Sequence, residues 1–188
     1  GEVIFNTSMT GYQEILTDPS YTGQIVTMTY PQIGNYGVNP DDMESKTTHA
    51  SALIVRELSQ LSSNWRATQT LDEWLIERRI PVLDGVDTRS LVKAIRSSGE
   101  CSGLLVPSDS RHTLEELREE ALDLPSMVGQ NLARQVSTRE SYFWPSATDS
   151  KPFNVIAYDF GIKYNILRIM NSLGMSVRVV PWNTTAEE

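Results

Sequence analysis

The sequence predicts a mixed α/β protein, with a layered strand-and-helix domain followed by the first strand–helix–strand unit of a doubly wound domain. Three observations support this prediction. Residues 1–145 contain short apolar, β-branched runs and amphipathic segments that carry helix caps. These predicted strands and helices follow one another without a regular βαβ order, which favours an α+β or a layered α/β domain. After residue 152 the order changes to strand, helix and strand, which is typical of a parallel sheet.

The strands of the first domain are predicted where apolar and β-branched residues lie between Gly and Pro. Residues 2–5 (EVIF) and 24–30 (QIVTMTY) fit this description, and the continuous run at 52–55 (ALIV) indicates a buried strand. Residues 102–106 (SGLLV) are a further candidate. In residues 6–37 Gly and Pro recur so often that we expect turns and no useful helix, and the polar residues 38–48 should form a surface loop.

Helices are predicted where start and stop signals frame an apolar stripe. Residues 70–79 begin with the capping box Thr70 and Glu73. Residues 89–97 follow a cap at Asp87 or Thr88, and Gly99 stops them. Residues 112–123 are capped near Thr113 and present a leucine-rich stripe, and residues 129–136 form a short fourth helix.

A small, polar segment divides the chain. Residues 146–152 (SATDSKP) are the best linker candidate, so we expect one domain at 1–145 and the start of another at 153–188. The second part contains a strand at 153–158, a turn at 159–161, a helix at 163–173 and a strand at 175–180. Because one such unit cannot bury both faces of its sheet, we expect the sequence to stop inside the second domain.

Composition excludes several classes of function. The chain has 188 residues, 39% hydrophobic and 21% charged, as in ordinary globular proteins. Its net charge of -8 argues against a nucleic-acid backbone or an anionic membrane as partner. One cysteine permits no internal disulfide, and no signal peptide or membrane-length apolar run is visible, so we expect a cytoplasmic protein.

Four blocks in order carry a family resemblance. They are GEVIFNTSMTGYQEILTDPSYTGQIVTMTYPQIGNYG at 1–37, SNWR at 63–66, GVDTRSLVKAIRSSG at 85–99 and VIAYDFGIKYNILR at 155–168. Together they resemble the small (glutaminase) subunit of the bacterial type of glutamine-dependent carbamoyl phosphate synthetase. The resemblance covers essentially the whole chain and implies truncation at both ends, with a strand segment before Gly1 and most of an amidotransferase domain after Glu188.

The resemblance implies an activity for the parent protein. Members of the family hydrolyse glutamine with a Cys nucleophile, a His base and an orienting Glu in a class I, flavodoxin-like amidotransferase domain. The ammonia passes to a large subunit, which uses ATP and Mg to make carbamoyl phosphate from bicarbonate for arginine and pyrimidine synthesis. This chain would bind no cofactor, and it lacks the catalytic elbow, so we expect it to be inactive alone.

Two residues are candidates for binding glutamine. By resemblance, Ser20 in the DPSY turn matches a Ser that contacts the substrate, whereas the turn by itself favours a hydroxyl that only stabilises it. Lys163 lies at a strand-to-helix turn, on the ligand edge of a doubly wound sheet, or is a solvated residue at the helix start. Asp159 in the same turn is expected to be a cap.

The other reactive side chains are expected to have structural or surface roles. Cys101 has no small-residue elbow around it, and His49 and His112 have no ligand partners at metal-binding spacing. No phosphate-binding glycine loop is present, so ATP chemistry would belong to another chain.

A basic helix face leaves two functions open. Arg89, Lys93 and Arg96 form a basic patch on an acidic protein, either a solvated face or a contact with the large subunit or the amidotransferase domain. The chain is therefore either part of a synthetase small subunit or a non-catalytic interaction module that retains the first domain.

Overall fold

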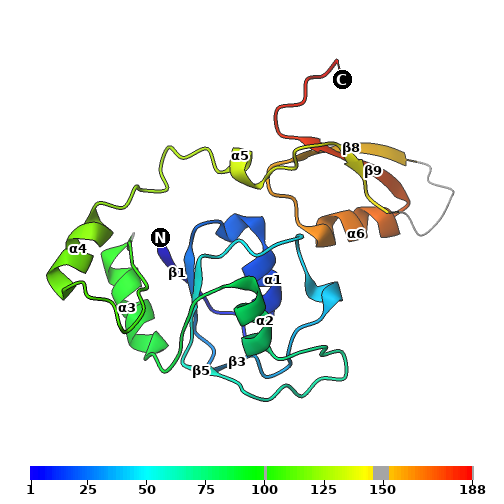
Figure 1. Ribbon diagram of the computed structural model, residues 1–188. Helices are drawn as coiled ribbons and strands as arrows, with labels where there is room; N and C mark the ends of the chain where they lie inside the picture. Colours follow the sequence, from blue (N-terminus) through cyan, green and yellow to red (C-terminus); the bar gives the residue numbers. More distant parts are fainter. Residues whose placement is uncertain (100, 146–152, 188) are drawn as a thin grey trace.

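The computed structural model describes residues 1–99, 101–145 and 153–187, and a parallel sheet forms the centre of its N-terminal part (Figure 1). The sheet contains four strands in the order β1 (Val3–Asn6), β2 (Ile25–Met28), β4 (Ala52–Ile54) and β6 (Val82–Leu83). Each neighbouring pair is parallel. The strands predicted at 2–5, 24–30 and 52–55 are confirmed, and β6 was not predicted.

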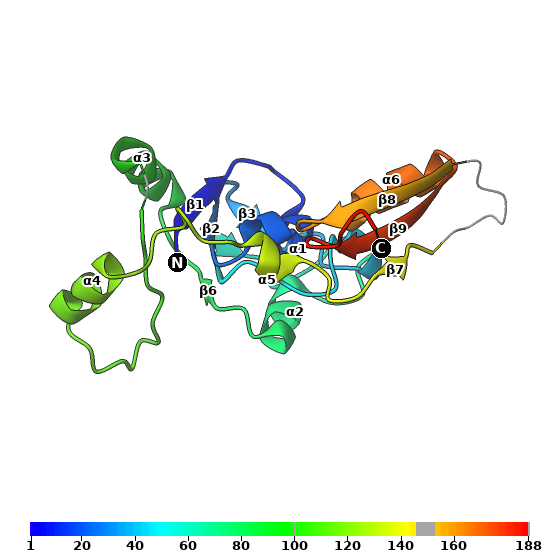
Figure 2. The ribbon, with the colours of Figure 1, turned by 90° about the horizontal axis from the view of Figure 1, so that it is seen from above.

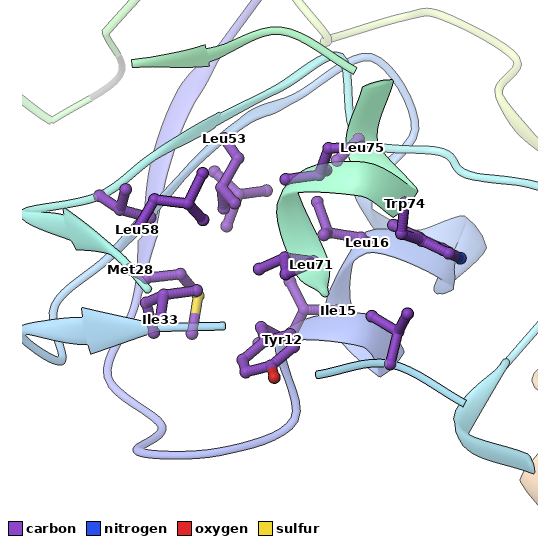
Figure 3. Packing of buried hydrophobic residues seen from close by; sticks show 14 residues of the cluster. Tyr12, Ile15, Leu16, Met28, Ile33, Leu53, Leu58, Leu71, Trp74 and Leu75 are labelled. Atoms are coloured by element: carbon purple, nitrogen blue, oxygen red, sulfur yellow. The ribbon is translucent and has the colours of Figure 1, made fainter. Parts of the chain in front are cut away.

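Side chains of this sheet alternate between two cores. On one face of the sheet lie the helices α1 (Tyr12–Thr17) and α2 (Leu71–Arg78) and a two-stranded parallel sheet of β3 (Gln32–Ile33) and β5 (Glu57–Leu58). Val26, Met28 and Leu53 pack against these elements, and Figure 3 shows this core. Ile25 and Ile54 face the other way, toward α3 (Thr88–Ser98). This alternation is the period of two that a pleated strand imposes. We call residues 1–99 the N-terminal unit.

The short helix α1 contradicts the prediction of turns alone in residues 6–37. It begins after Gly11, whose φ of 87° is left-handed. The Tyr36 hydroxyl accepts hydrogen bonds from the backbone N–H groups of Gly11 and Tyr12, and the two tyrosine rings stack with centroids 4.2 Å apart. A helix of six residues is too short to be stable alone, so these tertiary contacts decide it.

The strand predicted at 102–106 is also wrong. Ser102 forms only an isolated bridge with Glu2, and the backbone N–H of Gly103 donates to the Gly1 carbonyl oxygen. The chain then leaves the edge of β1 before a ladder of hydrogen bonds can form.

The predicted caps are confirmed in the helices. Thr70 and Glu73 form a capping box at α2, Asp87 caps α3, and Thr113 and Glu116 cap α4 (Leu114–Leu122). The fourth predicted helix is the single turn α5 (Ala133–Val136). The leucine-rich stripe of α4 is not buried, since its end leucines Leu114 and Leu122 are exposed. In both Figure 1 and Figure 2, α4 lies at the end of the molecule opposite β8 and β9.

A second sheet forms the C-terminal unit, defined as residues 142–145 and 153–181. β8 (Phe153–Asp159) pairs in parallel with β9 (Met175–Pro181), and α6 (Tyr164–Ser172) connects them, as the strand–helix–strand pattern predicts. β7 (Tyr142–Phe143), which was not predicted, pairs antiparallel with β9. The predicted linker at 146–152 lies outside the described residues, and the division into two domains stays a prediction.

Candidate functional site

Ser20 lies in a turn that Asp18 organises. After the extended Asp18, a 3-10 turn, η1 (Pro19–Tyr21), leads toward β2. The Asp18 carboxylate is buried and accepts a hydrogen bond of 2.9 Å from the backbone N–H of Ser20. Ser20 itself is exposed, and its hydroxyl has no hydrogen-bond partner among the described residues. The turn is therefore held by the Asp18 side chain, which leaves the Ser20 hydroxyl available to a ligand.

Lys163 meets the same carboxylate from the C-terminal unit. It is the N-cap residue of α6 and makes no side-chain cap bond. Its Nζ lies 3.3 Å from Asp18 Oδ2, and its side chain is 43% exposed. The structure thus brings both predicted binding residues to one buried carboxylate, although they are far apart in sequence. Asp18, which connects them, was not predicted as a site residue.

Glu44 attaches the start of α6 to the N-terminal unit. Its carbonyl oxygen accepts from the backbone N–H of Tyr164 at 2.8 Å, and its Oε2 accepts from that of Asn165 at 3.0 Å. Arg168 adds a hydrogen bond of 2.9 Å from Nη2 to the Met43 carbonyl oxygen. A carboxylate at this position satisfies free N–H groups and complements the positive end of the helix dipole. A residue of one unit therefore caps the helix of the other.

The position of Glu44 corrects the prediction of a surface loop at 38–48. Glu44, Asn39 and Val38 are buried, and η2 (Pro40–Asp42) forms within the segment. The backbone N–H of Glu44 donates to Thr17 Oγ1 at 2.9 Å. The acidic composition gave no signal for this role, because only contacts with α1 and α6 select Glu44 from the neighbouring acids.

Asp159 stabilises the turn between β8 and α6. Its Oδ1 accepts from the backbone N–H groups of Gly161 and Ile162, each at 2.9 Å, and its Oδ2 accepts from that of Thr138 at 2.7 Å. It caps this turn, while α6 begins after Lys163. A side chain at Gly161, which has a φ of 98°, would place its Cβ 3.0 Å from Pro19 Cβ. A glycine is therefore needed where the two units meet.

A cavity of about 210 Å³ lies between the two units beside this turn. His49 on its wall has Nδ1 3.2 Å from Thr22 Oγ1 and Nε2 3.1 Å from Ser45 Oγ. Burial lowers the pKa of His49, which favours the neutral imidazole. Burial also raises the pKa of Tyr142 to about 12, which favours the neutral phenol. Ser20 and Lys163 do not line this cavity. Its lining comes from both units and from the segment that precedes β7: Pro19, Ser45, Lys46, Thr47, His49, Gln135, Val136, Thr138, Tyr142, Asp159, Ile162 and Tyr164.

The remaining reactive side chains lie away from this junction. Cys101 is half-buried against the α3 side of the sheet, and its carbonyl oxygen accepts from the backbone N–H of Val3. His112 is exposed beside the start of α4. Within residues 1–99, 101–145 and 153–187, no group of three or more His, Cys, Asp or Glu side chains is placed to hold a metal ion. Among the same residues no helix has the length and apolarity of a membrane span.

These features define a class: an α/β protein in which a buried carboxylate joins a hydroxyl-bearing turn to the N-cap residue of a helix in a second parallel unit. Comparison with known proteins identifies the family. A family model described as the carbamoyl-phosphate synthase small chain, CPSase domain, matches residues 1–105. The chain belongs to the carbamoyl phosphate synthase small chain family.

Individual relatives align along the whole chain. It is 49% identical to the carbamoyl phosphate synthase small chain of Syntrophotalea carbinolica and 48% identical to that of Akkermansia muciniphila, and it covers 52% of each. It is also 49% identical to the chloroplastic small chain of Oryza sativa subsp. japonica, of which it covers 44%. The chain thus spans about half the length of the curated relatives it matches.

Proposed function

We propose that this chain is part of the small subunit of a glutamine-hydrolysing carbamoyl phosphate synthetase. The parent protein would release ammonia from glutamine and deliver it to a large subunit. That subunit would bind ATP and Mg and make carbamoyl phosphate from bicarbonate, for arginine and pyrimidine synthesis. Family membership supports this proposal, and the parallel β8–α6–β9 unit is compatible with the start of a flavodoxin-like amidotransferase domain.

The proposed glutamine-binding role rests on one observation: the backbone of Ser20 and the ammonium of Lys163 both contact the carboxylate of Asp18. The free Ser20 hydroxyl can donate to or accept from the polar end of an amino acid. The half-exposed Lys163 ammonium keeps N–H groups that can reach a carboxylate, while Asp18 fixes its position. In this proposal both residues orient substrate at the rim of the site and neither carries out the chemistry.

The proposal assigns no catalytic residue to these 188 residues. A glutaminase of this class needs a thiolate beside a His base and donors for the oxyanion. The recorded contact of the Cys101 thiol is a long one, 3.9 Å from Sγ to the Ser102 carbonyl oxygen, and the half-buried side chain packs against the α3 side of the sheet. We therefore expect the chain alone to show no Cys-dependent glutamine hydrolysis.

The substrate role is tested in the complete small subunit, assembled with its large subunit. Ser20→Ala should raise KM for glutamine by about tenfold, because one hydrogen bond to a charged or polar substrate is lost, and kcat should stay within about twofold. Ser8→Ala, at an exposed serine in the loop after β1, is the matched control and should leave both constants unchanged. An unchanged KM in Ser20→Ala would exclude the binding role.

The partner is tested by co-purification of this chain with the large subunit. One-to-one binding would support the synthetase role. A folded chain that binds neither the large subunit nor glutamine would favour the alternative, an interaction module with another partner.

A further inference from the structure

A second cavity, of about 350 Å³, lies at the opposite end of β2 from Asp18. Thr7 follows the last residue of β1, and Thr29 follows the last residue of β2. Both belong to the carboxyl edge of the parallel sheet, the edge at which α/β proteins usually bind ligands. The other lining residues come from α3: Arg89, Val92, Lys93 and Arg96. The volume is that of a small-molecule site.

The lining carries three positive charges and no carboxylate. Arg89, Lys93 and Arg96 recur at helical spacing, so they lie on one face of α3. None of the three forms an ion pair with another residue in the described part of the chain. The nearby carboxylate of Asp87 is already used as the N-cap, since it accepts from the backbone N–H of Ser90 at 3.1 Å and from its hydroxyl at 2.7 Å.

Hydroxyl groups complete the lining on the side of the sheet. The backbone N–H of Thr29 donates to the Asn6 carbonyl oxygen at 3.0 Å, which fixes the rim formed by the ends of β1 and β2. Thr27, two residues earlier on the same face of β2, is completely buried, and its hydroxyl has no hydrogen-bond partner among the described residues. The sheet side of the lining therefore consists of Thr7 and Thr29, and the buried Thr27 lies outside the lining.

We propose that this cavity binds a small phosphate-type oxyanion, either free phosphate or the phosphoryl group of a small metabolite. Guanidinium groups match the oxygens of such an anion with paired N–H donors, and the Lys93 ammonium adds a point charge. On a chain with a net charge of -8, a concave site with three cations and no acid concentrates anions locally. The proposal does not depend on the glutaminase role, because Ser20 and Lys163 lie at the other end of the sheet.

The test is a titration of this chain with inorganic phosphate, followed through its backbone amide NMR signals, with chloride at matched ionic strength as reference. Saturable shifts are expected at Thr7, Thr29 and Val92 with phosphate and not with chloride. Lys93→Gln and Arg96→Gln should each weaken binding by about tenfold, the loss expected for one charge-assisted hydrogen bond. Arg118→Gln, at an exposed arginine on α4, is the control, and its affinity for phosphate should stay within about twofold of that of the unmodified chain.

A titration with glycerol phosphate separates the two sources of the anion. Tighter binding than phosphate would support an organic phosphate, and equal binding would support the free ion. Absence of saturable shifts at the three amides would overturn the proposal. The proposal would also be overturned if poly-glutamate bound to the chain and phosphate did not compete with it. The helix face would then be a surface for an acidic polypeptide. Amide spectra of both variants show whether the fold is retained.

Discussion

The two sheets of the molecule differ in how they are covered. In the N-terminal unit, helices pack on both faces of the parallel sheet, and Leu53 at its centre is 0% exposed. In the C-terminal unit, α6 packs on one face, while Ile156 and Tyr158 on the other face of β8 are 63% and 41% exposed. The N-terminal unit therefore has its own core. The C-terminal unit has a smaller core on one face only, around Leu167, Val177 and Val179, and its neighbour supplies the Glu44 cap of α6.

The largest expected effect comes from comparing core residues of the two sheets. Leu53→Ala should lower the free energy of unfolding by about 2–5 kcal/mol, because it leaves a cavity between β4 and the helices. Ile156→Ala on the open face of β8 should change it by less than about 1 kcal/mol. Urea denaturation of both variants measures the difference, and equal losses would contradict the contrast between the sheets.

Removal of the Glu44 carboxylate tests the dependence of one unit on the other. Glu44→Ala should lower the free energy of unfolding by about 0.5–2 kcal/mol, as expected for a lost helix cap. It should also speed amide hydrogen exchange in α6, while α2 keeps its protection. Asp41→Ala is the matched control, since the Asp41 side chain is 84% exposed and makes only a 3.5 Å ion pair. Equal exchange rates in α6 of both variants would show that Glu44 is not a functional cap.

The ion pair between Asp18 and Lys163 should contribute less. Lys163→Gln is expected to lower stability by at most about 1 kcal/mol, because a half-exposed ammonium is screened by water. The difference in the free energy of unfolding between this variant and the unmodified chain should shrink as salt is raised from low to high ionic strength. Arg139→Gln, at an exposed arginine that forms no ion pair with the residues that the structure describes, serves as the reference. A loss that does not depend on salt would mean that packing, and not charge, is involved.

The smallest expected effect is the pH dependence that His49 adds at the junction. Burial lowers the pKa of His49 and outweighs the carboxylates of Asp18 and Asp159, which raise it. The unfolded chain then binds the proton more readily, so the His49 contribution to stability decreases as pH falls through the ordinary histidine value of about 6.5. His49→Gln should flatten this part of the profile between about pH 7 and 5, and His112→Gln should not. Identical profiles for the two variants would refute the assignment.

The parts of the fold that were predicted correctly are those with local causes. The capping boxes at Thr70 and Thr113 place a hydroxyl and a carboxylate within one helical turn, so neighbours in sequence satisfy each other. The run at 52–55 contains only apolar residues and forms β4, which is buried on both faces. Helix α1 was missed because its stability comes from Tyr36, and β7 because its partner β9 is distant in sequence.

The candidate site divides in the same way. Ser20 and Lys163 were proposed as binding residues from the family resemblance and from turn position, and that role stays a prediction, whereas the structure confirms Asp159 as the cap of its turn. Only the tertiary structure showed that Asp18 joins the first two, that Glu44 caps α6, and that Thr7 and Thr29 lie beside the cations of α3. The physical reason is that caps and alternating strands depend on neighbouring residues, whereas these contacts join segments that meet only when the sheets and helices have packed.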